Sequence, residues 1–130
     1  MVVLAWGLAM SSLQANEVIK TQKLANNVYA LIGPLTNRDP DNLGNNANFG
    51  VIVTNKGVVL VDSGATFKGA KMIHTAIKAI TDQPLKYVIN SGGQDHRWLG
   101  NGYFKEQGAT IIASKNAVID QKSRNQDQLI

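Results

Sequence analysis

The residues best suited to chemistry in this chain lie together between residues 90 and 101. Gln94, Asp95, His96 and Arg97 place an amide, a carboxylate, an imidazole and a guanidinium at successive positions. Imidazole and carboxylate groups are good zinc ligands, and a metal-bound water of near-neutral pKa is a hydrolytic nucleophile. An Asp–His pair is also found as a hydrogen-bonded structural feature at the start of a helix. The residue types alone leave a metal site and a structural pair open.

Short apolar segments predict the frame that positions these residues. Strands are expected at residues 17–24, 28–33, 49–54, 57–62, 85–90 and 109–114. Apolar residues at spacings of three and four predict a helix over residues 65–81, and helices are also expected over residues 98–107 and from residue 115 onward. This order predicts an α+β or α/β fold with a mixed sheet. The strand at 57–62 is nearly all apolar, so both of its faces are expected to be covered, although few helices are available to do so.

Polar residues at three other places are candidates for a function. Asp62 ends an apolar strand, where a carboxylate must be hydrogen-bonded or ligate something, and it can accept N–H groups at the start of the next helix. Residues 35–48 are rich in turn formers and predict a long exposed loop, either a functional lid or a surface insertion. Asn45 and Asn46 in this loop are candidate substrate-binding residues. His74 falls away from the apolar stripe of its helix and is expected in solvent.

Composition narrows the classes of partner and cofactor. The chain has 130 residues, enough for one domain, and its net charge is +4. Its thirteen Lys and Arg residues are scattered rather than clustered, so no nucleic-acid partner is expected. Without cysteine, any metal must be held by histidine, carboxylate or amide groups.

The first fifteen residues have the character of a secretory leader. They contain no charged side chain, and an apolar run too short to span a bilayer is followed by small and polar residues. Cleavage after Ala15 would leave a domain at residues 16–130 in the periplasm or outside the cell, with no stable membrane insertion. An apolar N-terminal helix that is retained is the alternative, because the usual basic start of a leader is missing.

The order of segments resembles the N-terminal half of the metallo-β-lactamase superfamily. The matching stretches are residues 27–33, 48–53, 57–64 and 88–101, with Asp62-Ser63-Gly64 at a strand end and Gly100-Asn101 at a helix start. The resemblance implies half of an αββα sandwich, with a mixed sheet and helices on one face. It also implies a zinc hydrolase acting on lactams, thioesters, phosphodiesters or sulfate esters. In this family a Thr-His-x-His-x-Asp-His loop holds one or two metals.

The chain departs from that loop at most of its ligand positions. Without gaps, Gly92 takes the place of the first histidine and Gln94 that of the second, while His96 and Arg97 replace the Asp and the last His. A one-residue slip places Asp95-His96 on the family's Asp-His pair, but the upstream histidines are still missing. A permanent guanidinium repels a metal ion, and an amide is a poor zinc ligand. The family's other ligands come from a C-terminal half, so these residues cannot build a dinuclear site.

Three hypotheses follow. The first is an exported hydrolase with an altered site, in which Asp95 and His96 are catalytic, His96 with Asp95 or Gln94 holds one zinc ion, and Arg97 binds an anionic group of a small-molecule substrate. A protein that binds ligands without any metal is equally compatible with the sequence. The third hypothesis is a half-domain that functions only as a homo-oligomer or with a missing C-terminal half, because its sheet would expose an apolar face.

Overall fold

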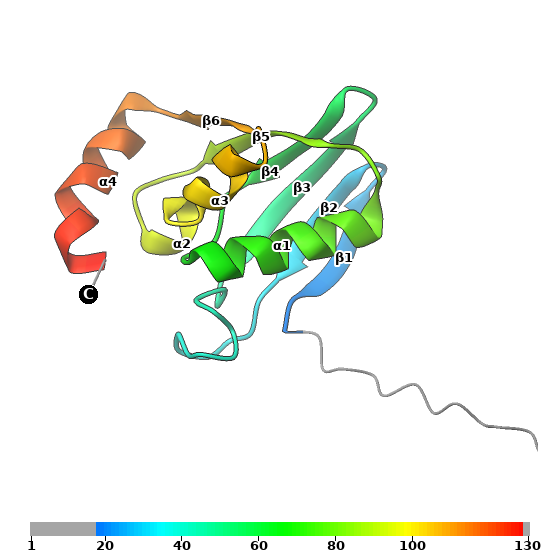
Figure 1. The fold of residues 1–130 in the computed structure, drawn as a ribbon. Helices are drawn as coiled ribbons and strands as arrows, with labels where there is room; N and C mark the ends of the chain where they lie inside the picture. Colours follow the sequence, from blue (N-terminus) through cyan, green and yellow to red (C-terminus); the bar gives the residue numbers. More distant parts are fainter. Residues whose placement is uncertain (1–17, 129–130) are drawn as a thin grey trace, which may run out of the picture.

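A computed structural model describes residues 18–128 as one mixed sheet with four helices (Figure 1). The strands are β1 (Lys20–Ala25), β2 (Val28–Ile32), β3 (Asn48–Thr54), β4 (Gly57–Val61), β5 (Leu85–Asn90) and β6 (Thr110–Ala113). The helices are α1 (Phe67–Ile80), α2 (Asp95–Trp98), α3 (Asn101–Glu106) and α4 (Lys115–Gln128). The predicted leader, residues 1–15, lies outside the described residues, so export stays a prediction. Between residues 18 and 128 no helix is long and apolar enough to cross a membrane.

The strands lie in the sheet in the order in which they occur in the chain. The first four pair antiparallel, with tight turns between β1 and β2 and between β3 and β4 and a long loop between β2 and β3, whereas β4, β5 and β6 pair parallel and are joined by helices. Parallel strands need a crossover connection, and α1 and α3 provide the two crossovers here. Because β4 and β5 are parallel, their carboxyl ends lie side by side at one edge of the sheet.

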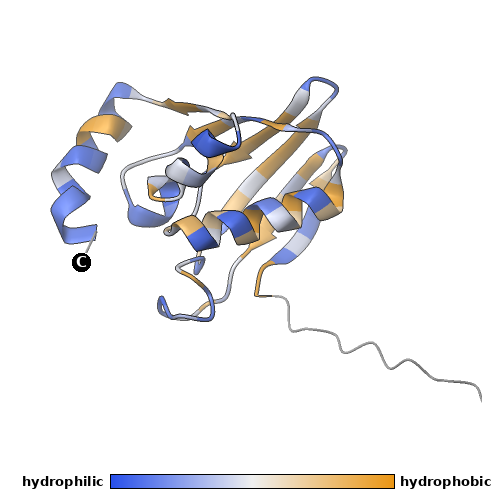
Figure 2. Ribbon diagram, in the orientation of Figure 1, coloured by the Kyte–Doolittle hydropathy of each residue, from blue (hydrophilic) through white to orange (hydrophobic). Residues whose placement is uncertain are grey.

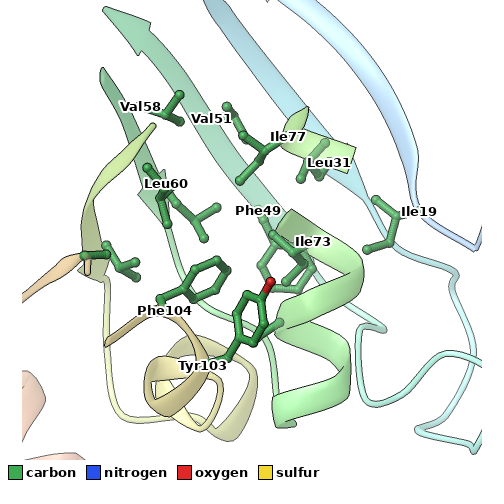
Figure 3. Close-up of a cluster of buried hydrophobic side chains, with 14 residues drawn as sticks. Ile19, Leu31, Phe49, Val51, Val58, Leu60, Ile73, Ile77, Tyr103 and Phe104 are labelled. Atoms are coloured by element: carbon green, nitrogen blue, oxygen red, sulfur yellow. The ribbon is translucent and has the colours of Figure 1, made fainter. Parts of the chain in front are cut away.

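The core lies between the sheet and the helices that cover one of its faces. Phe49, Leu60 and Phe104 are almost completely buried there, together with Ile73 and Ile77 of α1 (Figure 3). The predicted stripe of α1 is confirmed at Ala70, Ile73 and Ile77, which are buried. Phe67 begins the same stripe but is 47% exposed, because it lies at the first turn.

Among residues 18–128, no helix lies over the opposite face of the sheet (Figure 1). The pairing register places apolar residues of β2 to β6 on it, among them Ile52, Val59, Val61, Tyr87, Ile89 and Ile112. The expectation that both faces of β4 are covered is wrong, because Val58 and Leu60 are buried while Val59 and Val61 are only partly covered. The predicted mixed sheet with helices on one face is confirmed.

The helix expected over residues 98–107 is found as α3, which is shorter and begins at Asn101; the separate helix α2 ends at Trp98, with Leu99 and Gly100 between the two. Gly100 N–H donates to the Gly64 carbonyl over 2.8 Å, so the chain is held against the end of β4 at this point. A Cβ on Gly100 would lie 2.0 Å from the Ser63 carbonyl oxygen. The close approach of two backbone segments at Gly100 therefore lies between α2 and the start of α3.

His74 is buried, contrary to the expectation that it lies in solvent. Its exposed fraction is 9%, and its Nδ1 lies 2.9 Å from the Tyr103 hydroxyl on α3. The periodicity of α1 identified only the side that faces the sheet. Because α3 packs along the flank of α1, a second side of this helix is also covered.

Stability is expected to fall in mild acid partly because of His74. Burial, and secondly the charge of Lys78, lower the pKa of His74 below 6.5. Below that pH the unfolded chain binds a proton that the folded chain binds less readily, so the free energy of unfolding decreases. Urea unfolding at pH 7.5 and pH 5 should show a smaller difference for His74→Gln than for the parent chain. An equal difference in the two proteins would contradict this assignment.

Candidate functional site

The candidate site lies where β4 and β5 end. Asp62 follows β4, Ser91 follows β5, and both Asp62 oxygens accept bonds from Ser91: Oδ1 from its N–H over 2.8 Å and Oδ2 from its hydroxyl over 2.7 Å. Asp62 has φ +66°, in the left-handed region that few residues other than glycine adopt. Its two hydrogen bonds account for the cost of placing a carboxylate at the end of a buried strand.

Asp62 therefore joins two strand ends rather than capping α1. The residue that caps α1 is Thr66, whose hydroxyl accepts from the Gly69 N–H over 2.8 Å. Sequence reasoning correctly required a partner for Asp62 but assigned it to a neighbour in the chain. Its actual partner, Ser91, is 29 positions away.

A pair of asparagines holds the loop to the sheet. Asn90 and Asn101 exchange two side-chain hydrogen bonds of 3.0 and 2.7 Å, and the Asn90 amide also donates to the Arg97 carbonyl over 2.6 Å. Gly64 N–H donates to the His96 carbonyl over 2.8 Å. These bonds hold the backbone of α2 at residues 96 and 97. The Cα atoms from which these two side chains extend are therefore fixed in position.

Asp95 and His96 form a hydrogen-bonded pair. Asp95 Oδ1 lies 3.0 Å from His96 Nδ1 and 2.6 Å from the His96 backbone nitrogen. A carboxylate can only accept, so Nδ1 carries the proton and Nε2 has a free lone pair. The second Asp95 oxygen forms an ion pair with Arg38, from the loop before β3.

The imidazole of His96 is neutral at pH 7. Burial lowers the pKa of His96 below 6.5, and the charge of Arg97 lowers it further; the carboxylate of Asp62 acts in the opposite direction, and Arg38 has the smallest lowering effect. Its side chain keeps 27% of its exposure, so solvent reaches the ring. A neutral, oriented and accessible imidazole can act as a general base or bind one metal ion.

The side chain of Arg97 is hydrogen-bonded and partly buried, whereas that of Gln94 is exposed. Arg97 Nη1 donates to the Ser91 hydroxyl over 3.1 Å, which continues the chain of bonds to Asp62, while its Nε is buried without a partner among the described residues. No carboxylate among residues 18–128 lies within ion-pair distance of Arg97. Gln94 is exposed at the start of α2, and its side chain makes no capping bond.

The two candidate asparagines of the loop at residues 35–48 lie apart from this pair. The Asn45 side chain is fully buried and donates to the Gly69 carbonyl of α1 over 2.9 Å. Asn46 is exposed and donates to the Thr36 carbonyl over 3.0 Å. Both bonds hold the loop, and a substrate-binding role for either residue stays a prediction.

Helix α4 contacts the loop after β5 at Gly92 and Gly93. The Gln121 amide donates to the Gly92 carbonyl over 3.3 Å, and the Gln128 amide and the Trp98 indole both donate to the Gly93 carbonyl. A Cβ on Gly93 would lie 2.3 Å from the Asp120 carboxylate. The absence of a side chain at Gly93 thus allows contact with α4, which Figure 2 shows as a mostly hydrophilic helix.

The side chains of the described residues do not fit a zinc site of the kind that the resemblance implies. No group of three His, Cys, Asp or Glu side chains lies close enough between residues 18 and 128 to hold a metal ion. The Asp95 carboxylate is paired with Arg38. His96 is the imidazole of this loop, and the next residue, Arg97, carries a positive charge. Gln94, Asp95 and His96 stay the predicted ligands, and no catalytic step is derived from a metal here.

Arg38 and Ser91 are the site residues that sequence reasoning missed. Arg38 lies within a loop recognised only by its turn formers, 57 positions before the carboxylate that it binds. In the ungapped comparison with the family's loop, Ser91 takes the Thr position, which holds no metal. A signal for Ser91 was present, because parallel strands place the residues after their carboxyl ends together, and Asp62 needed a partner.

Comparison with known proteins gives the fold but little sequence similarity. No family sequence model matches the chain, and no curated protein matches it. Among solved structures, a metallo-β-lactamase from Pontibacter korlensis aligns with a TM-score of 0.66 and 19% identity over 82% of this chain and 48% of that one. A metallo-β-lactamase from Hirschia baltica aligns with a TM-score of 0.67 and 17% identity, over 82% of this chain and 48% of that one. The metallo-β-lactamase FIM-1 from Pseudomonas aeruginosa, in its mono-zinc form, aligns with a TM-score of 0.66 and 12% identity, over 82% of this chain and 46% of that one.

These alignments confirm the predicted half of a metallo-β-lactamase fold. The chain spans about half the length of the solved structures that it matches. Identities below 20% support the fold and carry no residue roles with them.

Proposed function

We propose that this chain, which has the fold of one half of a metallo-β-lactamase, carries a hydrolytic site in which His96 acts as the general base. The observation on which the proposal rests is the hydrogen bond between Asp95 and His96 Nδ1, 3.0 Å long, at the end of β5. This bond leaves Nε2 free to take a proton from water. The bond to be hydrolysed is that of an ester, a lactam or a related acyl compound.

In this proposal Asp95 positions the imidazole and stabilises its charged form. Water attacks the acyl carbon as its proton passes to Nε2, and the same proton then goes to the leaving oxygen or nitrogen. Arg38 keeps Asp95 in place through its ion pair.

The binding of an anionic substrate follows from the two arginines. Arg97 has no carboxylate partner among the described residues, so its charge is available to a carboxylate or phosphate. Arg38 also lines a groove of about 530 Å³ between its loop and the start of α1, together with Leu43, Phe67 and Lys68. A substrate with an apolar acyl part and one negative group would match this arrangement.

Hydrolysis is expected to depend on the neutral form of His96. Because the pKa of His96 is lowered, kcat/KM for the anionic probe mono-4-nitrophenyl succinate should be constant above pH 6.5 and fall below it, with a midpoint under 6.5. The midpoint should be absent from the residual rate of His96→Gln. Rates that are the same after treatment with EDTA would support a base without metal. Loss of the rate with EDTA, restored by zinc, would contradict this mechanism and favour the predicted metal site.

Binding without catalysis is the second candidate. It is favoured by Arg97, whose guanidinium is hydrogen-bonded to Ser91 and covered at Nε, as in a fixed anion-binding group. Isothermal titration with succinate distinguishes the two candidates: saturable binding weakened by Arg97→Lys, with no hydrolysis of the nitrophenyl ester, would favour this second function.

A further inference from the structure

Ser91 differs from the other serines between residues 18 and 128, because its hydroxyl bonds to charged side chains. Its Oγ donates to Asp62 Oδ2 over 2.7 Å and accepts from Arg97 Nη1 over 3.1 Å. The other serine hydroxyls in this part of the chain bond to backbone groups, in Ser63, Ser114 and Ser123. Ser91 is also exposed, so a molecule from solvent can reach it.

The carboxylate and the hydroxyl of this pair are held in place by backbone contacts. Asp62 N–H donates to the Ile89 carbonyl over 2.9 Å, and Asp62 Oδ1 accepts from the Ser91 N–H over 2.8 Å. Asp62 is 8% exposed, so little water competes for its second oxygen. A buried carboxylate fixed 2.7 Å from an exposed hydroxyl has the geometry of a base paired with a nucleophile.

Arg97 reaches the hydroxyl because residue 92 is glycine. A Cβ on Gly92 would lie 2.9 Å from Arg97 Nη1 and 3.3 Å from its Cδ. The guanidinium therefore lies against the backbone next to Ser91, where it can stabilise negative charge that develops near Oγ. A hydroxyl has one proton and two lone pairs. Because Asp62 accepts the proton and Arg97 bonds to one lone pair, the described contacts leave the second lone pair for attack.

We propose that Ser91 is a nucleophile that takes an acyl group from an activated ester. Its Oγ forms a bond to the acyl carbon, the bond from that carbon to the leaving oxygen breaks, and the Oγ proton passes to Asp62 Oδ2. The proton then goes to the leaving oxygen, so the products are an ester on Ser91 and a free alcohol or phenol. Arg97 stabilises the negative charge on the acyl oxygen during the attack. The inference goes beyond hydrolysis by His96 and does not depend on it.

Labelling with diisopropyl fluorophosphate is the measurement, because this reagent reacts with activated serines and its adduct is hydrolysed slowly. Oγ attacks the phosphorus, fluoride leaves, and the proton passes to Asp62 as in the acyl transfer. At pH 7.5 the folded chain should be labelled, and peptide mass spectrometry should place the label on Ser91. The chain in urea should not be labelled, because unfolding separates Asp62 and Arg97 from Ser91. No label on Ser91 in the folded chain, or equal labelling in urea, would overturn the inference.

A substitution at Asp62 tests the base. Asp62→Asn keeps an oxygen that accepts the Ser91 N–H but cannot take the hydroxyl proton, so the labelling rate should fall about 100-fold or more. Ser123→Ala, on the exposed part of α4, is the matched control and should be labelled at the parent rate. An Asp62→Asn variant that is folded by circular dichroism and labelled as fast as the parent would contradict the role of Asp62 as the base.

The labelling of Ser91 and the hydrolysis by His96 are separate results. A chain that is labelled at Ser91 but does not hydrolyse mono-4-nitrophenyl succinate would support the nucleophile and contradict the base at His96. A chain that hydrolyses this ester through His96 but takes no label at Ser91 would support the base and overturn the nucleophile.

Discussion

Replacing His96 with glutamine is expected to lower kcat/KM for mono-4-nitrophenyl succinate by about 10²- to 10⁴-fold, the usual contribution of a positioned general base. Glutamine retains a polar side chain of similar size, so the effect on folding should be small. Its amide cannot take a proton from water at neutral pH. The measurement is the initial rate at pH 7.5, with the concentration of folded protein determined by circular dichroism.

The second histidine of the chain provides the matched control. His74 lies on α1, where it bonds to Tyr103, and His74→Gln should keep the parent rate even if it is less stable. Asp95→Asn should show an intermediate loss, because it removes the group that orients the imidazole and leaves Arg38 without its partner. A His96→Gln variant as active as the parent would rule out His96 as the base.

Replacing Gly100 with alanine is expected to destabilise the fold by about 3 kcal/mol, at the upper end of the usual cost of overpacking. A Cβ at this position would lie 2.0 Å from the Ser63 carbonyl oxygen, 2.8 Å from the Ser63 carbonyl carbon and 2.9 Å from Cβ of Ala70. Neither neighbour is the flexible end of a side chain. The end of β4 and α3 would have to separate, together with the Gly100–Gly64 hydrogen bond.

Gly102 provides the control for this substitution. It lies two positions further on, within α3, and a Cβ there would meet nothing within 4 Å. Gly102→Ala should therefore raise the stability by up to about 1 kcal/mol, because alanine favours the helix. Thermal unfolding of the two variants should shift in opposite directions, by roughly 10 °C downward for Gly100→Ala. Equal shifts would show that the close backbone approach at Gly100 does not determine how a side chain there affects stability.

The strands were predictable because their signal is local. Residues 28–33, 49–54, 57–62 and 85–90 have β-branched and apolar side chains bounded by turn residues, and each matches a strand of the structure to within one residue at either end. The loop after β5 was also identified correctly as the place where polar groups gather. His74 and Asp62 were misplaced because their partners, Tyr103 and Ser91, are 29 positions away, and no local pattern reports such contacts.

The sequence by itself determined the mixed sheet, the order of its elements and the position of Asp95 and His96 after a buried strand, because hydrophobic periodicity and turn chemistry act between neighbours in the chain. Only the tertiary structure decided what these residues contact. The parallel pairing of β4 with β5 brings Asp62 to Ser91, and the loop before β3 brings Arg38 to Asp95. Arg38 holds the carboxylate that orients His96, and burial lowers the pKa of His96, since burial depends on groups brought together by the fold rather than by the sequence.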